Sequence, residues 1–266
     1  MIDLHCHVLP GIDDGPRTLE GSVGLARAAA AAGTRTIVAT PHVSWHYPNA
    51  AETIGELVDA VNRRFAAEGL AVDVRPGAEI ALTRLGEIPD DELAKLRLGA
   101  GPWLLVEPPF TPVVSGIETI LGELLRAGHG VVLAHPERCP AFHRDPRLLE
   151  SLLGAGVLTS ITAGSLVGAF GEAVRTFALE LVGRGMVHNV ASDAHDHLRR
   201  PPGVLREIER AGLAPLAAWL TQEVPEAILR GSETIPPRPE VEVTAPPPGK
   251  RPWWRRRDRP DLAEGA

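Results

Sequence analysis

Short apolar, β-branched runs alternate with longer helix-like segments along most of this 266-residue chain. Strands that alternate with helices favour a parallel sheet, and seven such units favour a barrel over an open sheet. We therefore predict an α/β fold built as a (β/α)7 barrel. The predicted strands are residues 2–5, 35–40, 71–80, 103–107, 131–134, 157–162 and 187–192.

The segments between these strands have the composition and periodicity of helices. Residues 19–32 are rich in alanine, with Thr18 as a plausible N-cap and Gly33 as a C-cap. Residues 51–68 place their apolar side chains on one stripe, as an amphipathic helix does. The other predicted helices are residues 90–96, 117–127, 146–154, 171–184, 203–211, 216–222 and 225–229.

Two histidines one residue apart, His5 and His7, follow the first predicted strand. Residues i and i+2 of a strand point to the same side, so both imidazoles can reach one ion while Cys6 points the other way. The chain then turns and offers two carboxylates, Asp13 and Asp14. Imidazoles and carboxylates are usual ligands of divalent metals, although the same residues also fit a strand end followed by an ordinary turn. The rest of the chain has to decide between the two.

Further imidazoles and carboxylates stand where the other predicted strands end. In a parallel β/α barrel those carboxyl ends form one rim, and active sites lie there. Any one such residue is more often a turn cap or a satisfied buried group, but so many at one rim indicate a metal centre. The candidate ligands are His5, His7, Asp14, His42, Glu79, Glu107, His135, Asp193 and His195.

Nine nitrogen and oxygen ligands are too many for one ion and suit two or three bridged ions, for which Mn, Fe and Zn are all chemically possible. Such a cluster lowers the pKa of a bound water and stabilises charge on a phosphoryl or acyl oxygen. Arg138 and Arg200 lie near the same rim, and guanidinium groups match phosphate oxygens. We therefore favour a phosphate substrate and count Arg138, Arg200 and Asp14 as candidate catalytic residues.

Composition argues against several other classes. The net charge of −7 argues against nucleic-acid binding by bulk electrostatics. Neither of the two cysteines, Cys6 and Cys139, is followed six residues later by the arginine that a cysteine phosphatase requires. Two cysteines do not suggest a disulfide scaffold, and the first residues lack the basic and apolar regions of a signal peptide. We expect a cytoplasmic protein.

The composition changes at about Pro236. Several prolines break any regular element, and arginines surround the Trp253-Trp254 pair. We predict one domain over residues 1–235 and a disordered tail over residues 236–266. A basic aromatic tail can contact an anionic membrane surface or an acidic partner, but a solvated tail is the simpler interpretation.

With these residues in place, the sequence resembles the PHP (polymerase and histidinol phosphatase) superfamily. Within it, the sequence is most similar to the manganese-dependent tyrosine phosphatases of the capsular-polysaccharide (CpsB/CapC) type. The motifs run in order over about residues 1–229, and the opening motif together with HPER is quite specific for that branch. They are HCHVLPGIDDG at 5–15, ATPH at 39–42, PGAE at 76–79, LVE at 105–107, HPER at 135–138 and SDAH at 192–195.

The resemblance implies a distorted seven-stranded barrel with a trinuclear Mn²⁺ site. It also implies that Arg138 and Arg200 grip phosphate. The implied substrate is the phosphotyrosine cluster on the tail of a bacterial tyrosine kinase that controls capsule or exopolysaccharide export, and a homo-oligomer remains open. The implied ligands are His5, His7, Glu79 and Asp193 for one metal, His42, Glu79, Glu107 and His135 for the second, and Asp14 and His195 for the third.

Two alternatives remain open from the sequence. A small-molecule phosphomonoesterase of the histidinol-phosphatase type would share the ligands but would have a deep polar pocket in place of an open mouth. A non-catalytic scaffold of a polysaccharide export complex would have no need of nine placed ligands. The chain also departs from the family pattern at Asp196 and Arg199, so Arg199 is a second candidate for the role given to Arg200.

Overall fold

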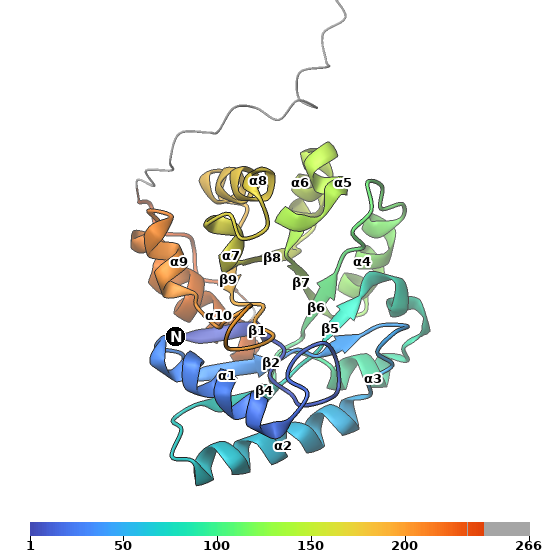
Figure 1. Ribbon diagram of the computed structural model, residues 1–266. Coiled ribbons are helices and arrows are strands. Elements are labelled where there is room, and N and C mark those ends of the chain that lie inside the picture. The colour runs from blue at the N-terminus through green and yellow to red at the C-terminus, as the bar shows by residue number, and fades with distance from the viewer. Residues whose placement is uncertain (233, 242–266) are drawn as a thin grey trace, which may run out of the picture.

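In the computed structural model, which describes residues 1–232 and 234–241, strands occupy the centre and helices surround them (Figure 1). Each predicted strand is present in the described residues, the predicted strand 71–80 is divided in two, and a further short strand at residues 42–43 was not predicted. The strands are β1 (Ile2–Cys6), β2 (Thr36–Ala39), β3 (His42–Val43), β4 (Asp73–Pro76), β5 (Glu79–Ala81), β6 (Trp103–Glu107), β7 (Gly130–Ala134), β8 (Leu158–Thr162) and β9 (Asn189–Ala191).

The predicted helices also form, with ends that differ by one or two residues. The exception is the segment 216–222, which is a π-helix, η4 (Trp219–Glu223), preceded by a short 3₁₀ turn, η3 (Ala214–Leu216). Two further 3₁₀ helices are η1 (Leu82–Glu87) and η2 (Pro136–Arg138). The α-helices are α1 (Leu19–Ala31), α2 (Ala51–Ala67), α3 (Asp90–Lys95), α4 (Ile117–Arg126), α5 (Pro140–Arg144), α6 (Pro146–Gly154), α7 (Ala163–Leu166), α8 (Glu172–Gly183), α9 (Leu205–Arg210) and α10 (Val224–Arg230).

The strands form two parallel sheets, with orders β1-β2-β4 and β3-β5-β6-β7-β8-β9. The division falls at two breaks, between β2 and β3 and between β4 and β5. Pro41 has no N–H to donate at the first break, and a side chain at Gly77 would meet Val38 Cγ1 at 2.8 Å at the second. Pairing resumes at once, because the Glu79 N–H donates to the Pro41 carbonyl at 3.1 Å. The α/β fold with parallel strands is thus as predicted.

The first and last strands lie side by side although they are far apart in sequence. Cys6 and Ala194 form a parallel bridge. The Asp193 N–H donates to the His5 carbonyl at 2.8 Å, and the His7 N–H donates to the Ala194 carbonyl at 2.9 Å. These contacts bring the His-x-His segment and the Asp-x-His segment to the same edge of the strands.

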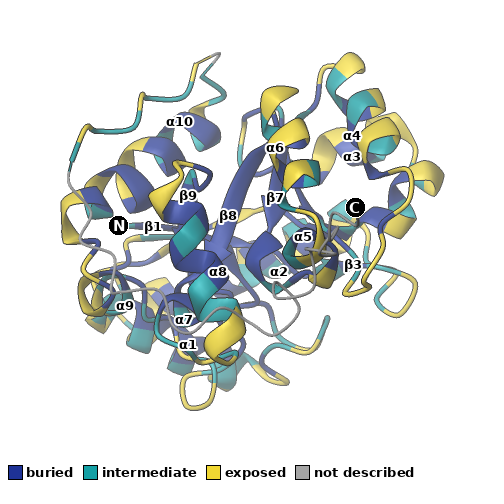
Figure 2. Ribbon diagram, turned by 90° about the horizontal axis from the view of Figure 1, so that it is seen from above, coloured by how far each residue is buried: buried dark blue, intermediate teal, exposed yellow. Residues whose placement is uncertain are grey.

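The core lies between the strands and the inner faces of the helices. In Figure 2 the central strands such as β7, β8 and β9 are buried, while the helices are buried on the side that faces them and exposed on the other. Helix α2 shows why: Ile54, Val58, Val61 and Phe65 recur at helical spacing and are all buried. No helix in the described residues has the length and apolar composition needed to cross a membrane.

The described residues continue past the predicted domain boundary at residue 235. The Trp219 indole donates to the Pro236 carbonyl at 2.9 Å, Arg238 donates to the Val182 carbonyl at 3.2 Å, and Val241 packs against the core. Residues 242–266, which carry the predicted basic tail and its membrane contact, lie outside the described residues. The division into 1–235 and 236–266 therefore stays a prediction.

His188, between β8 and β9, gives stability a pH dependence that can be measured. Burial lowers the pKa of His188 to about 4, and its Nδ1 accepts the Thr159 N–H at 3.2 Å. Because the unfolded chain takes up this proton near pH 6.5, stability contributed by neutral His188 is present above that pH and is lost as the pH falls toward 4. We expect about 2 kcal/mol of loss between pH 7.5 and pH 5 from this group.

Denaturant unfolding of the wild type and of His188→Gln at the two pH values measures this loss. The amide oxygen of glutamine can accept a hydrogen bond but does not titrate, so the variant is expected to lose about 2 kcal/mol less on acidification. Equal losses in the two proteins would show that His188 is protonated in the folded state as readily as in the unfolded one.

Candidate metal centre

The structure brings all nine predicted ligands into one cluster at the carboxyl ends of the strands. Four overlapping groups form, and in each group one ligand atom per residue lies within 4.8 Å of the others. The groups are His7, Asp14, His42 and His195; His5, His7 and Asp193; His5, Glu79 and His135; and His42, Glu79 and Glu107.

Glu79, the first residue of β5, lies at the centre of the cluster and is buried. Its Oε1 atom lies 2.8 Å from His135 Nε2. Its Oε2 atom lies 3.2 Å from His5 Nε2, 3.3 Å from His7 Nε2 and 3.1 Å from His42 Nδ1. One carboxylate therefore faces four imidazoles that lie in or directly after β1, β3 and β7, which is the arrangement of a bridging ligand.

Two features of this cluster fit divalent cations. His5 Nε2 and His7 Nε2 face each other at 3.2 Å, so either a proton on one of them or a cation near both has to keep their lone pairs from opposing each other. Among the described residues, no hydrogen bond of ordinary geometry reaches the buried Oε2 atom of Glu79. Buried polar atoms normally have a hydrogen-bond partner. A bound ion would contact both the two imidazole nitrogens and the Glu79 oxygen. The donors are imidazole and carboxylate throughout, which is the ligand chemistry of Mn, Fe and Zn.

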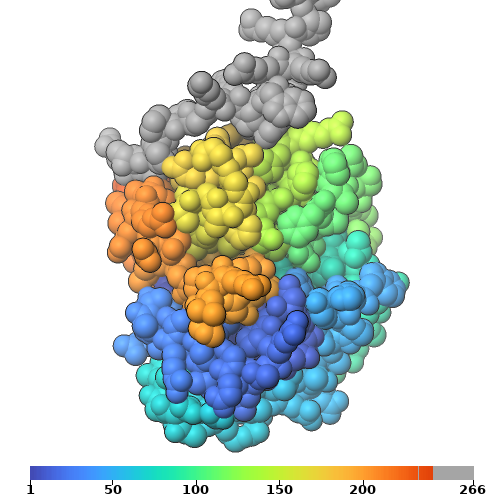
Figure 3. All heavy atoms as spheres, viewed as in Figure 1, coloured from blue at the N-terminus to red at the C-terminus, as the bar shows by residue number. Residues whose placement is uncertain are grey.

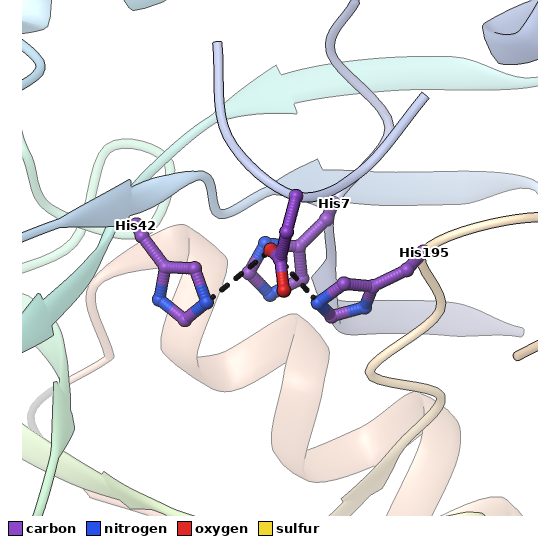
Figure 4. Close-up of side chains that lie close together, drawn as sticks. His7, His42 and His195 are labelled. Carbon is purple, nitrogen blue, oxygen red and sulfur yellow. Dashed lines mark ion pairs between the residues drawn. The ribbon is translucent and has the colours of Figure 1, made fainter. Parts of the chain in front are cut away.

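A second part of the cluster is more open to solvent. His7, His42 and His195 lie around one carboxylate, and the dashed lines in Figure 4 mark the ion pairs of His42 and His195 with it, which is that of Asp14. Asp14 Oδ1 lies 3.2 Å from His195 Nε2 and 3.5 Å from His42 Nε2. Burial works against the charge of Asp14, but the hydrogen bond with His195 and the charges of His195, His7 and His42 together hold the pKa of Asp14 well below its usual range. This group corresponds to the predicted third metal position.

Glu107, at the end of β6, borders the same cluster. Its carboxylate oxygens lie 3.7 Å from His135 Nε2 and 3.9 Å from His42 Nδ1. Burial, together with the negative charge of Glu79, raises the pKa of Glu107 to about 7. The buried carboxylate of Glu79 and the partly buried carboxylate of Glu107 thus lie together in this site.

Backbone conformation also marks the cluster. His135 and Asp193 have φ values of 30° and 51°, and they are the non-glycine residues with positive φ in the described part of the chain. Side chains other than glycine rarely adopt this region, and such strain concentrates at functional sites. Each residue follows a parallel strand, where the unusual backbone turns its side chain toward the cluster.

The two predicted phosphate-binding arginines converge on one ligand. Arg138 and Arg200 each donate to Asp193 Oδ2 at 2.6 Å. The Arg138 guanidinium also lies 4.4 Å over the ring of Phe170, which fixes its orientation. Arg199 is exposed, and its backbone N–H donates to Asp196 Oδ1. The geometry therefore favours Arg200 over Arg199 as the second arginine of the site.

Comparison with known proteins is decisive for the family. The family described as "Capsular polysaccharide synthesis, CpsB/CapC" matches residues 1–213. This chain belongs to the CpsB/CapC family. A relative in Bacillus subtilis, tyrosine-protein phosphatase YwqE, is 39% identical over 249 residues, covering 90% of this chain and 96% of YwqE. Tyrosine-protein phosphatase CpsB of Streptococcus pneumoniae is 32% identical and covers 76% of this chain and 86% of its own length.

A solved structure gives the same assignment of fold. Its description reads "Crystal structures of YwqE from Bacillus subtilis and CpsB from Streptococcus pneumoniae, unique metal-dependent tyrosine phosphatases". The TM-score is 0.80 at 37% identity, covering 91% of this chain and 100% of that one. The fold of this CpsB/CapC family member is thus that of a metal-dependent tyrosine phosphatase structure.

Sequence reasoning missed three buried carboxylates that support the ligands. Asp3 accepts hydrogen bonds from the Ser192 hydroxyl at 2.5 Å and the Ser192 N–H at 3.0 Å, which ties β1 to the segment that carries Asp193. Glu137 accepts from the Thr162 N–H at 2.9 Å and the Ser165 hydroxyl at 2.6 Å, and burial raises its pKa to about 7. The position of Glu137 in the HPER motif was the sequence feature that could have indicated its role.

Asp13 is the third of these carboxylates. Its Oδ2 lies 2.7 Å from His7 Nδ1 and accepts the His42 N–H at 3.2 Å, while its Oδ1 accepts the Gly15 N–H at 2.9 Å. A carboxylate that accepts Nδ1–H leaves the Nε2 lone pair of the imidazole free for a metal. Asp13 thereby holds His7 in the ligand tautomer. The sequence pointed to both carboxylates of the Asp-Asp-Gly turn, but only Asp14 was predicted to be a metal ligand.

We expect Asp13→Asn to weaken Mn²⁺ binding about 10- to 100-fold. An amide has one acceptor oxygen and cannot serve both His7 and Gly15 as the carboxylate does. Calorimetric titration of the metal-free protein measures the effect, with Asp59→Asn on the exposed face of α2 as the matched control. Unchanged affinity in Asp13→Asn would remove this positioning role.

The loop after β9 packs against the N-terminal part of the chain. In Figure 3 the orange segment lies directly against the blue one. A side chain at Gly24 would meet His197 Nδ1 at 3.1 Å, so α1 and this loop are in close contact there. Asp196, where the sequence departs from the family pattern, accepts the Leu198 and Arg199 N–H groups through its Oδ1 and so caps the loop. These charged residues therefore shape the loop, and the loop presents Arg200 to the site.

Proposed function

We propose that this chain is a metal-dependent protein-tyrosine phosphatase. The observation that carries the proposal is the single cluster of nine imidazoles and carboxylates with two arginines bound to one of its ligands. The family and its relatives support the choice of substrate: the proteins in Bacillus subtilis and Streptococcus pneumoniae are named tyrosine-protein phosphatases.

The ligand set fits two or three ions, and we propose Mn²⁺ as the cellular metal. His5, His7, Glu79 and Asp193 would hold one ion, and His42, Glu79, Glu107 and His135 would hold the second. Asp14 and His195 would hold the third. Bound divalent ions would lower the pKa of water toward neutrality and would offset negative charge on the phosphoryl group.

The protein's own groups orient the phosphate ester. Arg138 and Arg200 bind phosphoryl oxygens in the transition state, and Asp193 keeps their guanidinium groups aimed at the same point. Phenolate departs without strong help from a general acid, because the conjugate phenol has a pKa near 10. The site therefore suits an aryl phosphate such as phosphotyrosine.

The architecture and setting complete the proposal. The two sheets form a distorted seven-unit barrel of the PHP type, supported by the Cys6–Ala194 bridge and by the direct passages from β2 to β3 and from β4 to β5. The substrate is the phosphotyrosine cluster on the tail of a bacterial tyrosine kinase that controls capsule or exopolysaccharide synthesis. The protein works in the cytoplasm, where such tails lie.

A substrate panel tests the proposal. The Mn²⁺-loaded protein is assayed on a phosphotyrosine peptide, the matching phosphoserine peptide and histidinol phosphate, each with and without a chelator. We expect rapid, chelator-sensitive turnover of the phosphotyrosine peptide alone. Preference for histidinol phosphate would contradict the protein substrate, and bound metal without turnover of any of the three would favour a scaffold.

A further inference from the structure

Exposed apolar side chains stand on loops that follow the ligand-bearing strands. In the described part of the chain, the large hydrophobic residues that are exposed are Trp45, Phe110, Val113 and Leu198. Trp45 follows β3, Phe110 and Val113 follow β6, and Leu198 follows β9, so all four stand on loops that leave the ligand-bearing strands. Exposed apolar side chains that gather in one place mark a binding surface more often than scattered ones do.

Of these four, Phe110 is the one that packs on the predicted site residues. Its ring lies 5.4 Å from the His135 ring at an interplanar angle of 16°, which is a stacked arrangement. The Arg138 guanidinium lies 5.2 Å from the centre of the same ring. The Phe110 side chain is nevertheless 47% exposed. Part of the ring therefore stays available to a ligand that Arg138 binds.

The loop that carries Phe110 is held in place. Pro108, Pro109 and Pro112 restrict its backbone dihedral angles. The Thr111 N–H donates to the Pro109 carbonyl at 2.8 Å, and the Cys139 thiol lies 3.4 Å from the same carbonyl. An exposed ring on a rigid loop loses little entropy when it binds a partner, so this ring is preorganised for stacking.

We propose that Phe110 stacks against the aromatic ring of the substrate and thereby sets the preference of this site for aryl over alkyl phosphate monoesters. The Phe110 ring lies next to the Arg138 guanidinium. A phosphate ester whose phosphoryl group is bound by Arg138 therefore places its organic substituent beside Phe110. A phenyl ring there gains offset or edge-to-face contact, which a methyl or methylene group cannot provide. The inference rests on the proposed function, since it names what selects phosphotyrosine at the same site.

Binding of two phosphonates tests the inference without any turnover. Calorimetry compares phenylphosphonate with methylphosphonate on the Mn²⁺-loaded wild type and on Phe110→Ala. We expect the wild type to bind the phenyl compound about tenfold more tightly. Phe110→Ala is expected to bind the two compounds within about twofold of each other, with its affinity for methylphosphonate unchanged, and Phe110→Trp is expected to keep the phenyl preference.

Val113→Ala serves as the matched control, because Val113 lies on the same loop and is 61% exposed. A wild type without phenyl preference, or a Phe110→Ala variant that keeps it, would overturn the inference. Equal weakening of both phosphonates in Phe110→Ala would also overturn it, since Phe110 would then act by supporting Arg138. If the protein prefers phenylphosphonate but hydrolyses no phosphotyrosine peptide, the proposed function is wrong and the stacking role of Phe110 is retained.

Discussion

Glu79→Gln is expected to lose at least about 10³-fold of the phosphotyrosine turnover, together with most of the bound metal. Glu79 places two carboxylate oxygens against four imidazoles, those of His5, His7, His42 and His135. Glutamine keeps the shape of the side chain but has no charge and one acceptor oxygen, so it cannot bridge two cations. Turnover and metal content measured on one preparation give the result.

Glu56→Gln, on the exposed face of α2, is the control for the same chemical change. It is expected to match the wild type in both measurements, since it lies far from the cluster in the fold. Circular dichroism confirms that each variant is folded. A Glu79→Gln protein that keeps its metal and works within tenfold of the wild type would show that the carboxylate is not a bridging ligand.

Arg138→Ala is expected to reduce kcat about 10²- to 10³-fold, by analogy with the loss of a single oxyanion donor. The guanidinium is held between the Phe170 ring and Asp193 Oδ2, so it is aimed at the cluster before substrate arrives. Metal content is expected to stay near the wild-type level, because Arg138 is not a ligand. This combination separates loss of phosphate binding from loss of the metal centre.

Arg138→Lys sharpens the same experiment. Lysine keeps the charge but has no planar fork, and it does not stack on Phe170 as a guanidinium does, so we expect little recovery. Arg144→Ala, on the exposed end of α5, is the control for removal of a nearby arginine. Near-full activity of Arg138→Ala would make the assigned role wrong, even if the metal centre were intact.

The clustering of the candidate ligands could be predicted because their signals are local. The spacing of His5 and His7 places both on one side of a strand, and Asp193 and His195 repeat that spacing at the other end of the chain. Polar residues directly after apolar runs point to the carboxyl ends of parallel strands. Neither signal requires knowledge of which strands are neighbours.

The supporting residues could not be predicted in this way, because their roles depend on distant contacts. Asp3 acts through Ser192, a residue 189 positions away, and nothing in a single sequence gives that pairing. Phe110 follows β6, and its stacking on His135 depends on the register of β6 and β7. The separate strand β3, which begins at His42, likewise depends on pairing with β5 after the break at Pro41.

Metal titration tests the central claim most directly. Metal-free protein is prepared with a chelator, Mn²⁺ is added in steps, and bound ions per chain and phosphotyrosine turnover are measured on the same samples. We predict no turnover without metal and a rise to a plateau at about two to three ions per chain, since nine ligands are too many for one ion. Full turnover by the metal-free protein, or a plateau of binding with no turnover, would contradict the account.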